Sequence, residues 1–336
     1  MAPLPTTFTL EEKRMSDFWD GKRVVVTGGA GMVGSQLTAQ LLMAGAEVTV
    51  LDDFSRGQTR HPSAQYVVGD AGREGTCRDV FKSIFAVFNL AAAVAGVEFN
   101  QRHQSYMFES NLRLLQTPLK IAAEYGVERF LQTSSVCIYS PQQNHPCREE
   151  FGFSGNPTVA NEGYSLAKRM GEKLAEWYAE ETGIGAVIVR PSNIYGPRDY
   201  FDERAHVIPA FIRKCLNDDE IVVNGSGNEE REFIFTTDVA RGMMAAVEHG
   251  KPGAAYNLGT QGATCTTIRN LLVLIQNLTN SIDKPVRWTS AFDGGDSKRW
   301  SDCRRANEEL DWHHEVTLDD GLKQLVDWYV REGRDG

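Results

Sequence analysis

The sequence predicts an α/β protein with a doubly wound parallel sheet and a smaller C-terminal lobe. Short, nearly continuous apolar strands alternate with helical segments as far as residue 190. Strands of this kind are typical of a parallel sheet that helices cover on both faces. After residue 190, prolines and polar turns such as the stretch 224–230 break the pattern into short pieces. We therefore expect one large domain followed by a lobe that faces a substrate.

The elements follow in order along the chain. Residues 1–20 are expected to form an N-terminal extension or a short capping helix. The expected strands span 22–27, 47–51, 65–68, 86–90, 129–133 and 185–190, and the expected helices 31–43, 106–125 and 164–182. Residues 21–190 would form the large domain and 191–336 mainly the lobe. Segments near 233–258 are expected to return to the large domain, with 233–235 and 254–258 rejoining its sheet.

Composition excludes several function classes. The chain of 336 residues has 35 basic and 45 acidic residues, a net charge of -10, which disfavours nucleic-acid binding. No apolar run approaches the roughly 20 residues of a membrane span, and the N-terminus lacks the apolar core of a secretory signal. Six dispersed cysteines predict reduced thiols and a cytoplasmic protein. The cysteines show no paired spacing, so no metal site is expected.

A dinucleotide site is predicted where the first strand meets the first helix. Gly28, Gly31 and Gly34 are spaced GxxGxxG, which permits a tight turn, close approach of a diphosphate and close helix packing. Asp52 ends the second strand, where a carboxylate holds ribose hydroxyls and repels a 2′-phosphate. NAD is therefore favoured over NADP, although Arg56 lies nearby. Asp70 follows the third strand and is either an adenine contact or a turn residue.

A pair of catalytic type begins the helix at 164–182. Tyr164 and Lys168 are four residues apart, so they share one helix face, and the ammonium would stabilise the phenolate. Ser135 follows the strand 129–133 at the carboxyl edge, where ligands bind in such sheets. Its hydroxyl would hydrogen-bond the substrate oxygen that Tyr164 deprotonates.

The chain resembles the extended short-chain dehydrogenase/reductase family. The segments TGGAGMVG, LDDFSRG, NLAA, SSVCIY, YSLAK, RPSNIYGP and REFIFTTDVARG carry the resemblance, from residue 22 onward. It is most similar to sugar-nucleotide epimerases of the GDP-mannose 3,5-epimerase type, with features of GDP-fucose synthases. The resemblance implies a Rossmann-type fold, bound NAD(P), a nucleotide-diphosphate sugar and a homodimer through helices near 105–125 and 164–182. It also implies further contacts, with Met32, Val33, Leu90 and Ala91 at the cofactor and Gly96 at the substrate.

The resemblance assigns an acid/base pair to Cys137 and His206. Strand-like alternation would place Cys137 on the same face as Ser135, whereas the alternative is a small buried thiol. The mannose epimerase type has Lys where this chain has His206, and the fucose synthase type has His. A transient C4 ketone acidifies the protons at C3 and C5, so inversion needs one group to remove a proton and another to deliver one.

The resemblance places Asn193, Arg231 and Arg299 at the nucleotide diphosphate. Arginine can form bidentate hydrogen bonds with phosphate. The alternative for Arg231 is a surface ion pair with Glu229 or Glu230. The choice of a GDP-sugar rests on resemblance alone. The strand end reads Thr-Ser-Ser at 133–135, not the TDE of 4,6-dehydratases or the TSE of decarboxylating xylose synthases.

These observations favour an NAD-dependent nucleotide-sugar epimerase that oxidises C4 transiently and inverts C3, C5 or both. Three alternatives stay open at this point. They are a 4-epimerase, which needs no Cys–His pair, an epimerase or reductase of 4-keto sugars, and a non-catalytic NAD-sensing protein on the same fold.

Overall fold

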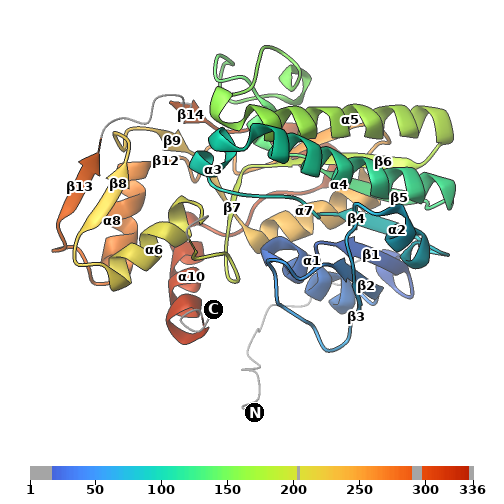
Figure 1. Cartoon of the computed structure of the whole chain (residues 1–336), viewed down its shortest axis with the longest axis horizontal. Helices are drawn as coiled ribbons and strands as arrows, with labels where there is room; N and C mark the ends of the chain where they lie inside the picture. Colours follow the sequence, from blue (N-terminus) through green and yellow to red (C-terminus); the bar gives the residue numbers. More distant parts are fainter. Residues whose placement is uncertain (1–16, 203–204, 290–296, 333–336) are drawn as a thin grey trace.

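A computed structural model describes residues 17–202, 205–289 and 297–332. Its larger half is built on a parallel sheet that helices cover on both faces, and a smaller lobe lies beside it (Figure 1). The expected fold class is therefore confirmed.

The central sheet has seven strands in the order β11-β6-β5-β4-β1-β2-β3, and every pairing is parallel. The chain starts in the middle at β1, winds outward to β3, then returns to β4 and winds the other way. A crevice forms at the carboxyl ends of β1 and β4, where the direction of winding changes. The strands are β1 (Arg23–Thr27), β2 (Glu47–Asp52), β3 (Gln65–Val68), β4 (Ala86–Asn89), β5 (Arg129–Thr133), β6 (Gly185–Pro191) and β11 (Ala255–Leu258).

Helices cover both faces because the strands are apolar on both. Val24 and Val26 of β1 point into one core, which α1 (Met32–Met43) and α7 (Thr236–His249) cover. Val25 points into the opposite core, beneath α2 (Glu74–Val80), α4 (Gln104–Glu124) and α5 (Glu162–Thr182). Figure 1 shows α4 and α5 side by side on this face.

Short helices connect these elements. They are α3 (Val97–Arg102), η2 (Val136–Ile138), η3 (Glu149–Phe151) and η4 (Val159–Asn161). A further one, η1 (Asp17–Trp19), precedes β1. The side chain of Trp19 is only 1% exposed and packs against Phe88, so residues 17–19 belong to the core of the large half. Residues 1–16 of the expected extension lie outside the described residues.

The smaller lobe has its own apolar core and three small sheets. Its strands are β7 (Asn193–Tyr195), β8 (Ile221–Asn224), β9 (Glu230–Arg231), β10 (Phe233–Phe235), β12 (Thr266–Thr267), β13 (Val286–Thr289) and β14 (Lys298–Arg299). Its helices are α6 (Val207–Asn217), α8 (Ile268–Leu278) and α10 (Leu318–Glu332), while α9 (Arg304–Leu310) packs against α7.

One expected strand pairing is wrong. Residues 233–235 form β10, but this strand pairs with β7 in a separate two-stranded sheet and not with the large sheet. The chain does return to the large half immediately afterwards, because α7 covers the sheet and β11 pairs with β6. The apolar side chains of β10 can be buried equally well in the core of the small lobe or in the large sheet. The local sequence pattern is the same in both cases and does not distinguish them.

Candidate active site

A cleft of about 960 Å³ lies at the carboxyl ends of the central strands and is lined by residues of both halves. Every residue that the sequence nominated for a catalytic, cofactor or substrate role lines this cleft. The folded chain therefore brings together positions from Gly28 to Arg299.

The glycine-rich turn has little room for side chains where it packs on its neighbours. Gly28 has a φ of +69°, and a Cβ there would meet the backbone nitrogen of Ala91 at 2.9 Å. A Cβ on Gly34 would lie 2.2 Å from the carbonyl oxygen of Gly28. Gly31, by contrast, faces the cleft together with Met32 and Val33 at the start of α1. Since a helix N-terminus presents unpaired N–H groups, this cradle fits the diphosphate of a dinucleotide.

Asp52 sits at the end of β2 and organises the same turn. Its carboxylate accepts hydrogen bonds from the backbone N–H of Ala30, at 2.9 Å, and of Phe54, at 2.8 Å. Burial raises the pKa of Asp52, and the two N–H groups counteract this. A carboxylate has about four lone-pair positions, so Asp52 retains capacity for ribose hydroxyls.

Arg56 is occupied elsewhere. Its guanidinium forms an ion pair of 2.5 Å with Asp202 and stacks on Tyr200, with 4.1 Å from the guanidinium carbon to the ring centre. A guanidinium held in this way is not directed at a 2′-phosphate beside Asp52, which removes the main argument for NADP.

Asp70 also lines the cleft, but its oxygens have protein partners. One accepts the N–H of Gly72 at 2.7 Å, and the other pairs with Arg113 at 2.7 Å. Arg113 and that N–H lower the pKa of Asp70 against the opposing effect of burial. The structure therefore shows Asp70 as a turn residue whose two oxygens are both hydrogen-bonded. A contact with adenine would have to form in addition to these hydrogen bonds.

Buried polar groups place the loop after β4. The hydroxyl of Thr27 accepts hydrogen bonds from the N–H groups of Leu90 and Ala91. Asn111 of α4 exchanges hydrogen bonds with the backbone of Ala93, at 3.1 and 3.0 Å. Gly96, which precedes α3, closes this stretch of the cleft wall. Sequence reasoning missed Asn111, because nothing local distinguishes a buried helix asparagine from an exposed one.

Tyr164 and Lys168 lie on one face of α5, as their spacing predicts. The Lys168 ammonium nitrogen is 5.5 Å from the centre of the Tyr164 ring and donates a hydrogen bond of 2.8 Å to the carbonyl oxygen of Thr133. Burial lowers the pKa of Lys168 to about 8, against the opposing effect of Glu172. Burial also raises the pKa of Tyr164, and a hydrogen bond with Ser135 counteracts this.

The expected strand-like alternation of Ser135 and Cys137 is wrong. β5 ends at Thr133, and Ser135 caps the short helix η2, its hydroxyl accepting the N–H of Cys137 at 3.1 Å. The two residues are thus neighbours in a helical turn and not alternate residues of a strand. Both still line the cleft next to Tyr164.

Cys137 also contacts the small lobe. The guanidinium of Arg299 donates a hydrogen bond to its sulfur at 3.2 Å, across 162 positions of sequence. A half-buried thiol in contact with a guanidinium is not the isolated apolar cysteine of the alternative interpretation.

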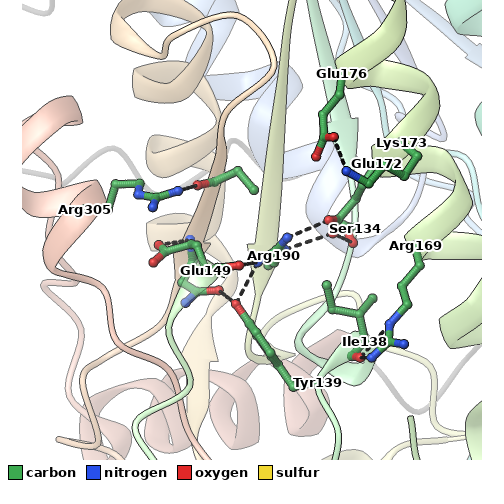
Figure 2. A network of polar contacts seen from close by, with 12 residues as sticks. Ser134, Ile138, Tyr139, Glu149, Arg169, Glu172, Lys173, Glu176, Arg190 and Arg305 are labelled. Carbon is green, nitrogen blue, oxygen red and sulfur yellow. Dashed lines mark hydrogen bonds and ion pairs between the residues drawn. The ribbon is translucent and has the colours of Figure 1, made fainter. Parts of the chain in front are cut away.

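A buried ion pair supports α5, the helix that carries Tyr164 and Lys168, from behind (Figure 2). Glu172 is eight residues after Tyr164 on the same face of α5, and its side chain is completely buried. It pairs with Arg190 of β6 at 2.9 and 2.6 Å and accepts the hydroxyl of Ser134. Arg190 also donates to Tyr139 at 2.9 Å. Sequence reasoning missed this network, although the i, i+4, i+8 spacing on α5 was a signal for Glu172.

Two arginines line the opposite wall of the cleft. Arg231 of β9 and Arg299 of β14 are direct partners in the parallel register. Burial and the neighbouring Arg299 lower the pKa of Arg231 to about 10. Glu230 pairs instead with Lys298 at 2.7 Å, and Glu229 accepts the hydroxyl of Ser226. The buried Arg299 and the half-buried Arg231, side by side, favour an anionic ligand between them.

Asn193 and Glu232 connect this wall to the sheet. The Asn193 amide donates a hydrogen bond of 2.7 Å to the carbonyl oxygen of Glu232. The Glu232 carboxylate is fully buried and accepts the N–H groups of Thr260, Gly262 and Ser301. These bonds fix where β9 and β14 present their arginines.

His206 enters the cleft from the small lobe. It precedes α6 as the N-cap residue, and its side chain makes no capping hydrogen bond. It is exposed to the cleft, and the surrounding walls together with Arg56 lower its pKa. The charged group that contacts the sulfur of Cys137 is the guanidinium of Arg299 and not the imidazole of His206.

The described residues hold no group of three or more His, Cys, Asp or Glu side chains arranged for a metal ion. Within the same ranges, the helices are too short or too polar to cross a membrane.

The chain matches the model of the NAD dependent epimerase/dehydratase family over residues 24–259. It belongs to that family. The match runs from β1 through β11 and so includes the glycine-rich turn and the Tyr164–Lys168 pair. The protein is thus an NAD-dependent enzyme of the nucleotide-sugar epimerase, dehydratase and reductase class.

Curated relatives within the family carry out different reactions. A dTDP-4-dehydro-6-deoxy-D-allose reductase of Streptomyces sp is 30% identical over 94% of this chain and 98% of its own. A GDP-L-fucose synthase of Sinorhizobium fredii is 29% identical over 93% of this chain and 96% of its own.

Solved structures agree with the fold and the cofactor. The UDP-glucose 4-epimerase of Thermotoga maritima, solved with UDP-glucose, superposes with a TM-score of 0.85 at 28% identity, over 92% of this chain and 99% of that one. A double mutant of the dTDP-glucose 4,6-dehydratase of Streptomyces venezuelae, solved with NAD, gives 0.84 at 27% identity, over 93% and 98%.

Proposed function

We propose that this protein is an NAD-dependent nucleotide-sugar epimerase that oxidises C4 of the sugar transiently and inverts C3, C5 or both. The observation that carries the proposal is the placement of Cys137 beside the Ser135–Tyr164 pair, in the cleft that also holds the dinucleotide cradle. A simple oxidation at C4 has no use for a polar thiol at that point.

The redox step is assigned to three side chains. Tyr164 accepts the proton of the C4 hydroxyl, and Ser135 donates a hydrogen bond to the same oxygen. The Lys168 ammonium, 5.5 Å from the Tyr164 ring, stabilises the phenolate that starts the step. NAD, which the turn with Gly28 and Gly31 and the carboxylate of Asp52 would hold, would supply hydride acceptance and donation at C4.

The inversion step is assigned to Cys137 and His206. Cys137 comes from the large half, after β5, and His206 from the small lobe, at the start of α6. Groups from opposite halves suit an inversion, because a proton must leave one face of the sugar and arrive on the other. Both a thiol and an imidazole exchange protons near neutral pH.

The substrate is proposed to be a GDP-sugar, with its diphosphate held by Asn193, Arg231 and Arg299. The paired arginines of β9 and β14 support the diphosphate. The preference for GDP rests on resemblance to GDP-sugar enzymes in two segments, SSVCIY and the stretch HVIPA at residues 206–210. The names of the relatives given above contain dTDP, GDP and UDP sugars. We further propose a cytoplasmic enzyme, consistent with six cysteines that are all free thiols.

We also propose a homodimer through α4 and α5. Large apolar side chains are exposed on these helices, including Tyr106 at 52% and Trp177 at 52%. Trp177→Glu should convert the dimer to a monomer in light scattering coupled to size exclusion, whereas an unchanged mass would reject this surface.

Turnover in heavy water separates this proposal from its alternatives. Incubation with a panel of nucleotide sugars, read by NMR, should place deuterium at C3, C5 or both, and none at C4. The 4-epimerase alternative, favoured by the similarity to the Thermotoga enzyme, predicts inversion at C4 without solvent deuterium. A reductase predicts net consumption of a reduced cofactor.

Two variants assign the steps to residues. Tyr164→Phe should fold and bind NAD but form no reduced cofactor at 340 nm. Cys137→Ala should still reduce the cofactor yet fail to invert the neighbouring carbon. Cys265→Ala is a matched control, because Cys265 is a half-buried thiol that does not line the cleft, and it should behave like the unmodified protein. Normal inversion by Cys137→Ala would return Cys137 to a structural role.

A further inference from the structure

The loop after β2 reaches across to the segment after β7. Arg56, in this loop of the large half, forms the 2.5 Å ion pair with Asp202 and the stacking contact with Tyr200 described above. Asp202 and Tyr200 belong to the segment that leads into the small lobe. These residues are separated by about 145 positions of sequence, and the contact connects the two halves at the rim of the cleft.

This contact lies directly over the dinucleotide cradle. Gly57, next to Arg56, packs so closely that a Cβ there would be 2.2 Å from the carbonyl oxygen of Ala30. On the other side, the Tyr200 hydroxyl lies 3.5 Å from the position of a Cβ on Gly31. The loop and Tyr200 thus flank the turn that fits the diphosphate.

The segment after β7 is shaped to present Tyr200. The N–H of Asp199 donates to the carbonyl oxygen of Gly196, and one carboxylate oxygen of Asp199 accepts the N–H of Tyr200 at 2.8 Å. Asp199 is itself 6% exposed, so this turn is anchored in the interior. The aromatic ring is therefore held by the small lobe, while the guanidinium that stacks on it is held by the large half.

We propose that Arg56, Tyr200 and Asp202 form a clasp that closes over the diphosphate of bound NAD and retards its release. The Tyr200 hydroxyl is close enough to Gly31 to donate a hydrogen bond to a phosphate oxygen there. Release of the dinucleotide requires Arg56 to leave both Tyr200 and Asp202, which separates the halves. An enzyme that returns its hydride to the same sugar benefits from a cofactor that does not exchange between turnovers.

The proposal rests on NAD binding and not on the reaction at the sugar, so its test omits any sugar. Protein loaded with NADH is mixed with excess NAD, and the loss of bound-NADH fluorescence gives the dissociation rate. An exposed ion pair and a cation–π contact together justify an increase of about tenfold for Arg56→Ala. The association rate should change by less than about twofold.

Arg60→Ala is the matched control. Arg60 lies on the same loop but stacks on Phe54 and Tyr66 of its own half, at 4.0 and 4.9 Å. Its removal should leave the dissociation rate unchanged. Asp202→Asn should accelerate release, and the double variant Arg56→Ala/Asp202→Asn should be no faster than Arg56→Ala, because Arg56→Ala already removes the ion pair with Asp202 as well as the stacking on Tyr200.

Three outcomes would overturn the clasp. The first is an unchanged dissociation rate in Arg56→Ala. The second is equal acceleration by Arg60→Ala, which would indicate a general loosening of the loop. The third is a slower association rate with no faster release, which would make Arg56 an electrostatic attractor and not a clasp.

Discussion

Replacement of Arg190 by methionine should destabilise the protein more than almost any other single change at a charged residue. Arg190 and Glu172 are 3% and 0% exposed and meet at 2.6 Å. Methionine fills similar space but supplies no donor, so the buried Glu172 carboxylate would lose both hydrogen bonds of the ion pair and keep the one from the hydroxyl of Ser134. Tyr139 and the carbonyl oxygen of Glu149 would also lose a hydrogen bond from the guanidinium.

The size of the effect follows from this burial. Removal of one partner of a buried ion pair costs about 3–5 kcal/mol, because the other charge is left uncompensated. Unfolding entropy is roughly 2.1 cal/mol/K per residue, which gives about 0.7 kcal/mol/K for a chain of this length. The melting temperature in calorimetry should therefore fall by about 4–7 °C.

Two comparisons make the result interpretable. Arg287→Met removes an exposed pair with Glu220, in which the side chains are 56% and 42% exposed, and should cost less than about 1 kcal/mol. The double variant Arg190→Met/Glu172→Gln removes both charges and should recover part of the loss. If Arg190→Met shifts the melting temperature no more than Arg287→Met does, or if the double variant is less stable than the single one, the reasoning about the buried charge is refuted.

Further outcomes are expected at the cofactor site and on α5. Gly34→Ala should lose NAD affinity and at least about 2 kcal/mol of stability, because its Cβ would lie 2.2 Å from a backbone carbonyl oxygen. Gly75→Ala is the control and should be neutral or stabilising, because the space around Gly75 is open. Equal melting temperatures of the two variants would contradict this reasoning. Asp52→Ala should narrow the ratio of NAD to NADP affinity measured by calorimetry, and a ratio near one in the unmodified protein would reject the assignment. Burial lowers the pKa of Lys168 from 10.5 to about 8 in the folded protein. Between these two values the unfolded chain binds more protons than the folded one, so the free energy of unfolding rises with pH. Relative to Lys168→Met, the unmodified protein should gain about 2 kcal/mol between pH 7 and 9.5 in denaturant titrations, and a constant difference would show that Lys168 titrates normally.

The cofactor half could be read from sequence because its signals are local. A helix separates the strands 23–27 and 47–52, another follows the strand 65–68, and the spacing of Gly28, Gly31 and Gly34 is fixed within one turn. The Tyr164–Lys168 pair depends only on helix periodicity. In each case the physical cause acts over a few residues, so the pattern in the sequence is the pattern in the structure.

The second lobe could not be read in the same way. Whether 233–235 joins the large sheet or pairs with β7 depends on which distant edge is available, and both choices bury the same side chains. The contact between Arg299 and Cys137 joins positions 162 residues apart. A third prediction failed at Ser135 for a local reason. The strand ends at Thr133, and Ser135 begins a short helix by accepting the N–H of Cys137.

The two halves contribute different parts of the proposed site. Tyr164, Lys168 and Ser135 belong to the large half, and the buried Glu172–Arg190 pair fixes them relative to the sheet. In the proposed function, the position of a sugar above them would be set instead by Arg231 and Arg299, which the small sheet and Glu232 hold in register. A shift of these two strands relative to the large half would present a different carbon to the same tyrosine. In the proposed function, the register between the halves would therefore act together with Cys137 and His206 in selecting the carbon that reacts.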